Sequence, residues 1–208
     1  MATIKLIFEA CVETLEDTLA AEQRGANRIE LCSALDQDGL TPSRELTAQC
    51  VYYLSIPVMA MVRPRGGDFV YSEAEIRQME VEIEFFKQSG VAGVVFGLLT
   101  NENTIDIENT KRLAKQAFPL EITFHKAIDY TVDPFKSFQE LNAVEGITRV
   151  LTSGGKDTAW NGRMVLLQMN EFPGRKIKII AAGKVLRENS LQLAEFTGIR
   201  ELHGKRIV

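Results

Sequence analysis

Residues 56–97 read IPVMAMVRPRGGDFVYSEAEIRQMEVEIEFFKQSGVAGVVFG and contain one complete unit of the fold. The apolar runs at 56–62 and 93–97 predict two buried strands. The segment 72–90 has a helical pattern that ends in glycine, a residue that favours a helix stop. Strands joined through a helix pair in parallel, because parallel neighbours need a crossover connection. This stretch therefore indicates an α/β fold.

The same alternation extends over the chain of 208 residues. Eight apolar runs predict strands, at 4–10, 27–32, 56–62, 93–97, 121–125, 148–153, 178–183 and 200–204. Seven amphipathic segments predict helices, at 14–25, 43–54, 72–90, 105–117, 133–144, 157–169 and 187–198. This count predicts a TIM-like (β/α)8 barrel. Only KRIV follows the last strand, so we expect the last helix to be lacking. An open doubly wound sheet is the alternative, although no GxGxxG turn follows the first strand.

Composition limits the class of protein and its partners. With 45% hydrophobic and 25% charged residues and no linker, residues 1–208 are predicted to form a single soluble domain. A net charge of -4 argues against nucleic acid or an anionic membrane as partner. No apolar run approaches a membrane span, and the N-terminus lacks a signal-peptide pattern, so we expect a cytoplasmic location. The three cysteines indicate reduced thiols.

Strand alternation predicts which side chains enter the barrel, since residues two apart share a face. It turns many ionisable groups inward, and unpaired buried charges are costly. Barrel enzymes carry their chemistry at the carboxyl ends of the strands. The polar residues that we place at those ends, converging on one mouth, are Glu9, Cys11, Glu30, Cys32, Arg63, His125, Ser153 and His203.

The loop RPRGGDF, residues 63–69, is a candidate anion site. Arg63 and Arg65 carry planar donor groups suited to carboxylate or phosphate. In the simpler alternative, Asp68 pairs with one of these arginines and stiffens the loop. We favour an arrangement in which one arginine is paired and the other faces an anion. Replacing either arginine with alanine is then expected to spare the fold.

A second candidate anion site is TSGG, residues 152–155, at the end of the sixth predicted strand. There Ser153 and Gly154 are expected to present backbone N–H groups to an anion, close to a helix start. The motif is weak when taken alone.

Cys11 and Cys32 are candidate metal ligands. By strand spacing, residues at the ends of adjacent parallel strands lie about 4.7 to 4.9 Å apart. Soft thiolates select Cu(I), so the pair predicts a copper site. The alternative is that both are small buried residues, as cysteines often are. For Met59 and Met61, one face of a barrel strand is a better explanation than metal binding.

Several motifs together resemble the copper homeostasis protein CutC family over essentially the whole chain: RIELCSALDQDGLTPS, IPVMAMVRPRGGDFVYS, GVVFGLLT, TFHKAID, RVLTSGG and RELHGK. The resemblance implies a TIM-barrel-like fold, a cytoplasmic role in copper handling, frequently a homo-oligomer, and in some members Cu(I) bound by cysteines that match Cys11 and Cys32. The sequence departs from the family pattern at Lys126, an arginine in many members, which alternation turns away from the lumen. It also departs at Gly183 and Lys184, where a glycine-rich run is usual.

Two classes of function follow. One is a copper-binding protein with Cu(I) at the cysteine pair. The other is a barrel enzyme of lyase or isomerase type that acts on a small anionic metabolite. In the enzyme, the loop arginines with Asp68, Ser153, Gly154 and His203 would bind the substrate, His125 would act as general acid or base, and Glu30 would tune it.

The lacking helix also predicts assembly. Without it, the outward-facing apolar residues Ile4, Leu6, Phe8 and Leu202 are expected to lie partly bare. Exposed apolar patches of this kind usually meet a partner. We therefore expect a homodimer or a higher homo-oligomer.

Overall fold

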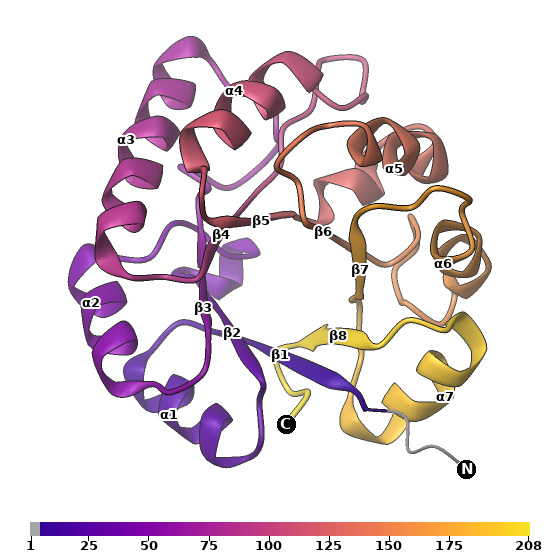
Figure 1. The fold of residues 1–208 in the computed structure, drawn as a ribbon, viewed down its shortest axis with the longest axis horizontal. Helices are drawn as coiled ribbons and strands as arrows, with labels where there is room; N and C mark the ends of the chain where they lie inside the picture. The colour runs from indigo at the N-terminus through magenta and orange to yellow at the C-terminus, as the bar shows by residue number, and fades with distance from the viewer. Residues whose placement is uncertain (1–4) are drawn as a thin grey trace.

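A computed structural model describes residues 5–208 of the chain (Figure 1). Eight parallel strands close into a barrel in the order β1 to β8. The strands are β1 (Ile7–Val12), β2 (Arg28–Leu31), β3 (Val58–Met61), β4 (Gly93–Phe96), β5 (Glu121–Phe124), β6 (Arg149–Thr152), β7 (Lys178–Ala181) and β8 (Glu201–Gly204). The described residues form seven α-helices outside the barrel: α1 (Leu15–Gln23), α2 (Arg44–Tyr53), α3 (Glu73–Ser89), α4 (Ile107–Ala117), α5 (Pro134–Asn142), α6 (Arg163–Asn170) and α7 (Arg187–Thr197). The predicted (β/α)8 barrel is confirmed.

The observed elements differ from the predicted ones at a few boundaries. Strand β1 ends at Val12, two residues beyond the prediction, and Ile4 lies outside the described residues. Helix α6 begins at Arg163, because the preceding segment forms turns and Gly162 packs against the Ser153 carbonyl. A Cβ on Gly162 would lie 1.8 Å from that oxygen. Two short 3-10 helices, η1 (Leu35–Gln37) and η2 (Lys126–Tyr130), were not predicted.

The barrel has an outer apolar core and two smaller separate clusters, one of which consists of Leu151, Ile180 and Ala182. Strand residues such as Ile29 and Leu31 belong to the large core between the barrel and its helices. A smaller cluster lies on the inner faces of β1 to β4 and comprises Cys11, Cys32, Met59, Met61 and Val95. The two methionines are therefore core residues on one strand face, as predicted.

The first residues of four strands, together with Glu9, form an ion network across the amino end of the lumen, which is buried except at Glu121. Arg28 pairs with Glu9 and, at 2.8 Å, with Glu201. Arg149 continues the chain of contacts to Glu201, at 3.0 Å, and to Glu121. Burial would raise the pKa of Glu9, but Arg28, followed by His203, lowers it to about 2. The sequence had led us to expect Glu9 at the mouth. It is instead a structural residue of this ion network.

The C-terminal residues cover part of the surface that an eighth helix would cover. Among the described residues, no helix follows β8. Ile207 is fully buried in the outer core together with Leu202, while Leu6 and Phe8 are partly buried against it. The expectation that Leu202 lies bare is therefore wrong. A homo-oligomer remains a prediction, and a monomeric mass in sedimentation equilibrium would contradict it.

Candidate functional site

A cavity of about 1210 Å³ opens at the carboxyl ends of the strands. Its wall includes six of the residues expected at the site: Cys11, Glu30, Arg63, Asp68, His125 and His203. Gly183, Lys184 and Lys126 also line it, so Lys126 does not face away from the lumen as predicted. Cys32 is fully buried beside Cys11. Arg65, Ser153 and Gly154 are not among the lining residues.

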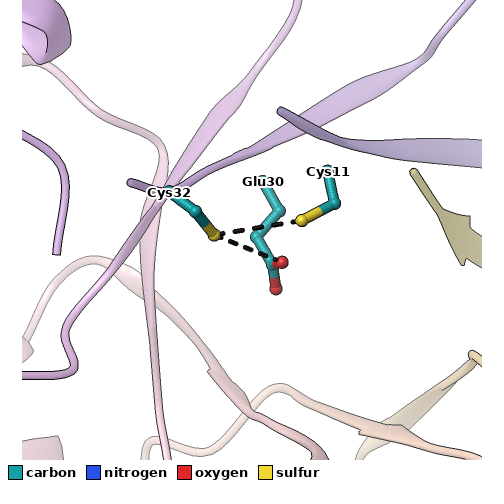
Figure 2. A group of neighbouring side chains, drawn as sticks. All are labelled: Cys11, Glu30 and Cys32. Carbon is teal, nitrogen blue, oxygen red and sulfur yellow. Dashed lines mark hydrogen bonds between the residues drawn. The ribbon is translucent and has the colours of Figure 1, made fainter. Parts of the chain in front are cut away.

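The two cysteines meet at the edge of this cavity (Figure 2). Cys11 lies opposite Glu30 in the β1–β2 register, and Cys32 follows the last residue of β2. The two Sγ atoms are 3.9 Å apart, and both thiols are free. Glu30 lies beside them, with its Oε2 3.7 Å from Cys32 Sγ. The sequence-based expectation that the two side chains lie close together agrees with this geometry.

The two thiols differ in acidity because they share one hydrogen bond. The contact with Cys32 lowers the pKa of Cys11 well below its ordinary value, against the effect of burial. The same contact, and then burial, raises the pKa of Cys32 well above its ordinary value. The metal-free pair therefore favours a thiolate at Cys11, on the cavity wall, and a thiol at Cys32 behind it.

Glu30 and His203 complete the polar group at this end of the lumen. His203 lies between two carboxylates, with Nδ1 2.8 Å from Glu9 and Nε2 3.7 Å from Glu30. Burial would lower the pKa of His203, but Glu30, Cys11 and Glu9 together raise it well above its ordinary value. Burial raises the pKa of Glu30 well above its ordinary value, although His203 opposes this. Among the described residues, Glu30 Oε1 has no hydrogen-bond partner.

His125 lies on the opposite side of the barrel wall, just before η2. Its Nδ1 accepts a hydrogen bond from the Ala127 N–H at 3.2 Å, which places the proton of the neutral ring on Nε2. Burial, and then the charge of Arg63, lowers the pKa of His125 to about 3. Gly97 is required beside the ring, since a Cβ there would lie 2.4 Å from Nδ1. Sequence patterns did not indicate that close approach.

The two arginines of the 63–69 loop have different partners. Arg65 pairs with Asp68 at 2.9 Å and with Glu75 at 2.6 Å, so Asp68 does pair with one arginine. Arg63 is buried and donates to the carbonyl oxygens of Gln37, Gly39 and Gly67 at 3.0 to 3.3 Å. No described carboxylate forms an ion pair with it. Arg63 therefore brings an uncompensated positive charge to the cavity wall.

The amides of the TSGG segment are bound to an internal carboxylate. The N–H groups of Ser153 and Gly155 donate to Asp129, at 2.8 to 3.1 Å. The N–H of Gly154 donates to Thr152 Oγ1. Lys126 pairs with Asp129 and donates to Ser153 Oγ. Of the two N–H groups that we expected to face a bound anion, that of Ser153 already has an anionic partner from η2, and that of Gly154 has a neutral one.

The chain has two histidines, and in the reduced, metal-free protein their ionisation should shift in opposite directions. His125 should stay neutral down to about pH 3, whereas His203 should stay protonated above its ordinary value of 6.5. Because the unfolded chain binds a proton at His125 that the folded one does not, this residue makes stability fall as pH drops from 6.5 towards 3. Nitrogen NMR of labelled imidazoles measures the pKa of each histidine, and the variant His125→Gln shows which signals belong to His125. Two histidines that both titrate at their ordinary value would contradict this description.

Comparison with known proteins decides the family. The model of the CutC family matches residues 6–208. The chain belongs to the CutC family. A CutC family protein of Photobacterium profundum is 41% identical over 201 residues, which are 97% of this chain and 81% of the relative. One of Mesorhizobium japonicum is 39% identical over 197 residues, 95% of this chain and 76% of the relative.

One solved structure agrees with this CutC assignment, and another shares only the fold. A structure assigned to the copper homeostasis protein CutC of Streptococcus agalactiae superposes with a TM-score of 0.92 at 33% identity, covering 98% of this chain and 100% of that one. A structure assigned to a deoxyribose-phosphate aldolase of Coccidioides immitis has a TM-score of 0.70 at 13% identity, over 97% of this chain and 81% of that one. The second likeness shows the barrel fold alone. In the part of the chain that the structure describes, no helix has the length and apolar character needed to span a bilayer.

Proposed function

We propose that this CutC family member takes part in copper handling by binding Cu(I) through Cys11 and Cys32. The observation that carries the proposal is the 3.9 Å separation of two free, buried sulfur atoms. Thiolates are the soft ligands that Cu(I) prefers, so the donor set fits the ion. Cys11 lines the cavity, which gives an ion a route to the pair. The copper homeostasis role ascribed to the Streptococcus agalactiae relative supports the same function.

A Cu(I) site built from two free thiols needs a reducing compartment. The cytoplasm keeps thiols reduced, and we propose that the protein works there. Metal binding requires deprotonated sulfur, so it must release protons. Cys11, whose pKa is already lowered by Cys32, loses its proton first, and the metal then replaces the proton of Cys32.

The reduced protein should bind about one Cu(I) per chain through thiolates. Cys11→Ser and Cys32→Ser should each weaken binding at least about 10-fold, because each removes one of two soft ligands. Competition against a chromophoric Cu(I) chelator measures both quantities. Cys50→Ser is the matched control, since Cys50 is equally buried but lies in α2, away from the cavity. Equal losses in all three variants, or no binding by the unmodified protein, would contradict the proposal.

A second candidate function is that of a barrel enzyme of lyase or isomerase type for a small anionic metabolite. The observation in its favour is Arg63, a buried cation on the cavity wall that has no described carboxylate partner. The charge of Arg63 helps to lower the pKa of His125, which also lines the cavity. Glu30 contacts His203 and Cys32, so any tuning by Glu30 acts on His203 more directly than on His125.

The cysteine variants also distinguish the two functions. An enzyme site at Arg63 and His125 should keep its affinity for phosphate or a small carboxylate when Cys11 and Cys32 are both serine. Isothermal titration of the double variant with these anions makes the comparison. Anion binding that disappears together with copper binding would contradict a separate enzyme site.

A further inference from the structure

The cysteine pair has a third donor group that two-coordinate Cu(I) does not need. The Glu30 carboxylate lies beside the two sulfurs, and one donor atom from each of Cys11, Glu30 and Cys32 lies within 4.8 Å of the others (Figure 2). All three side chains are buried. Glu30 Oε1 has no partner among the described residues, and an unsatisfied buried oxygen of this kind is costly. A bound cation would remove that cost.

The distances within the group match a tetrahedral metal ion better than a linear one. Metal–sulfur bonds of about 2.3 Å place two sulfurs about 3.8 Å apart in a tetrahedron and about 4.6 Å apart in a line. The observed separation is 3.9 Å. With a metal–oxygen bond of about 2.1 Å, a sulfur and an oxygen of the same tetrahedron lie about 3.6 Å apart. Cys32 Sγ and Glu30 Oε2 are 3.7 Å apart.

The chemistry of the donors points the same way. Carboxylate oxygen is a hard ligand that adds little to Cu(I), whereas Zn²⁺ accepts sulfur, nitrogen and oxygen together. Two of the three residues, Cys11 and Glu30, line the cavity, while Cys32 lies behind them. The fourth corner of a tetrahedron built on these residues therefore faces the cavity. Three protein ligands with one open position are typical of catalytic zinc sites, whereas structural zinc sites have four protein ligands.

We infer that Glu30 is a metal ligand, and that Cys11, Cys32 and Glu30 together form a site for a borderline divalent cation of the Zn²⁺ type with one position open to the cavity. This inference shares the cysteine pair with the proposed Cu(I) site. It differs in what Glu30 does: the carboxylate is essential for the divalent ion and dispensable for Cu(I).

The test compares Zn²⁺ and Cu(I) affinities of the reduced protein and its variants, each by competition with a chromophoric chelator. Glu30→Gln keeps the size of the side chain and removes its charge. Asp38→Asn is the matched control, because Asp38 is also a carboxylate on the cavity wall and its left-handed backbone, with φ of 64°, suits asparagine. Glu30→Gln should lower the affinity for Zn²⁺ at least about 10-fold and the affinity for Cu(I) by less than about 2-fold. Asp38→Asn should change neither affinity.

Three results would overturn the inference: Zn²⁺ affinity of Glu30→Gln within about 2-fold of the unmodified protein, an equal loss for both metals, or an equal effect of Asp38→Asn. If Glu30→Gln does not fold, the unmodified protein loaded with Co²⁺ decides. Thiolate charge-transfer bands with a tetrahedral ligand-field spectrum support the site, and an octahedral spectrum without those bands overturns it. Zn²⁺ binding without Cu(I) binding would overturn only the proposed copper function, and the reverse only this inference.

Discussion

Replacing Arg28 with methionine should lower the free energy of unfolding by about 3–5 kcal/mol, the usual effect of removing one partner from a buried ion network. Arg28 is the link between Glu9 and Glu201, which are both buried. Methionine keeps much of the packing volume but leaves Glu9 with only His203 as a cationic partner. Urea unfolding of the purified variant at neutral pH measures the loss.

The same variant should also change the response of the protein to acid. The pKa of Glu9, lowered to about 2, makes a contribution to stability that is present above its ordinary value of 4.5 and is lost as pH falls towards 2. Without Arg28 this contribution shrinks, so stability should fall less steeply over that range. Arg112→Met is the control, because its partners Glu73 and Glu80 lie on the surface and such pairs contribute about 0–1 kcal/mol. Equal losses in the two variants would show that the network does not stabilise the barrel.

Replacing Arg63 with alanine should lower the free energy of unfolding by about 2–4 kcal/mol, since it removes the donor from three carbonyl oxygens. Those carbonyls belong to Gln37, Gly39 and Gly67, so the guanidinium joins the loop after β2 to the loop after β3. This reverses the expectation that Arg63 can be replaced without harm to the fold. Denaturant unfolding gives the energy, and faster amide exchange in both loops locates the effect.

Arg65→Ala is the paired control for this experiment. Arg65 also donates to carbonyl oxygens, those of Gly66, Asp68 and Val70, but they belong to its own loop. Its side chain is 37% exposed, so its ion pairs with Asp68 and Glu75 are open to solvent. Arg65→Ala should lower the free energy of unfolding by about 1 kcal/mol or less. If Arg65→Ala lowered the free energy of unfolding as much as Arg63→Ala does, burial of the arginine would not explain the expected difference between the two variants.

Most of the barrel is predictable from the sequence because each strand is a short apolar run between polar segments. The predicted strand at 178–183, for example, differs from β7 only at its end. Helix α6 was predicted six residues too long at its start, because the pattern of 157–169 does not reveal that Gly162 must contact the Ser153 carbonyl. Local periodicity describes neighbours within one helix or strand, so it does not show a contact between two separate segments.

The site was predictable to the extent that strand alternation holds. The period of two placed Cys11, Glu30 and His203 on the lumen side, and the structure brings them together there. Alternation ends where β5 passes into η2, and this is why Lys126 reaches the cavity wall. Two features depend on partners that are distant in the sequence, so spacing does not show them. One is the bonding of Arg63 to the loop after β2, and the other is the pairing of Glu9 with Arg28.

The carboxylate of Asp129 bears on what the mouth can recognise. It accepts hydrogen bonds from the amides of Ser153 and Gly155, so a residue of the chain itself holds the loop after β6 in shape. A phosphate ester could bind these amides only by displacing Asp129, whose charge is already paired with Lys126. These amides are therefore not available for phosphate recognition, and an anion that enters the cavity meets instead the cationic side chains on its wall, such as Arg63 and Lys184.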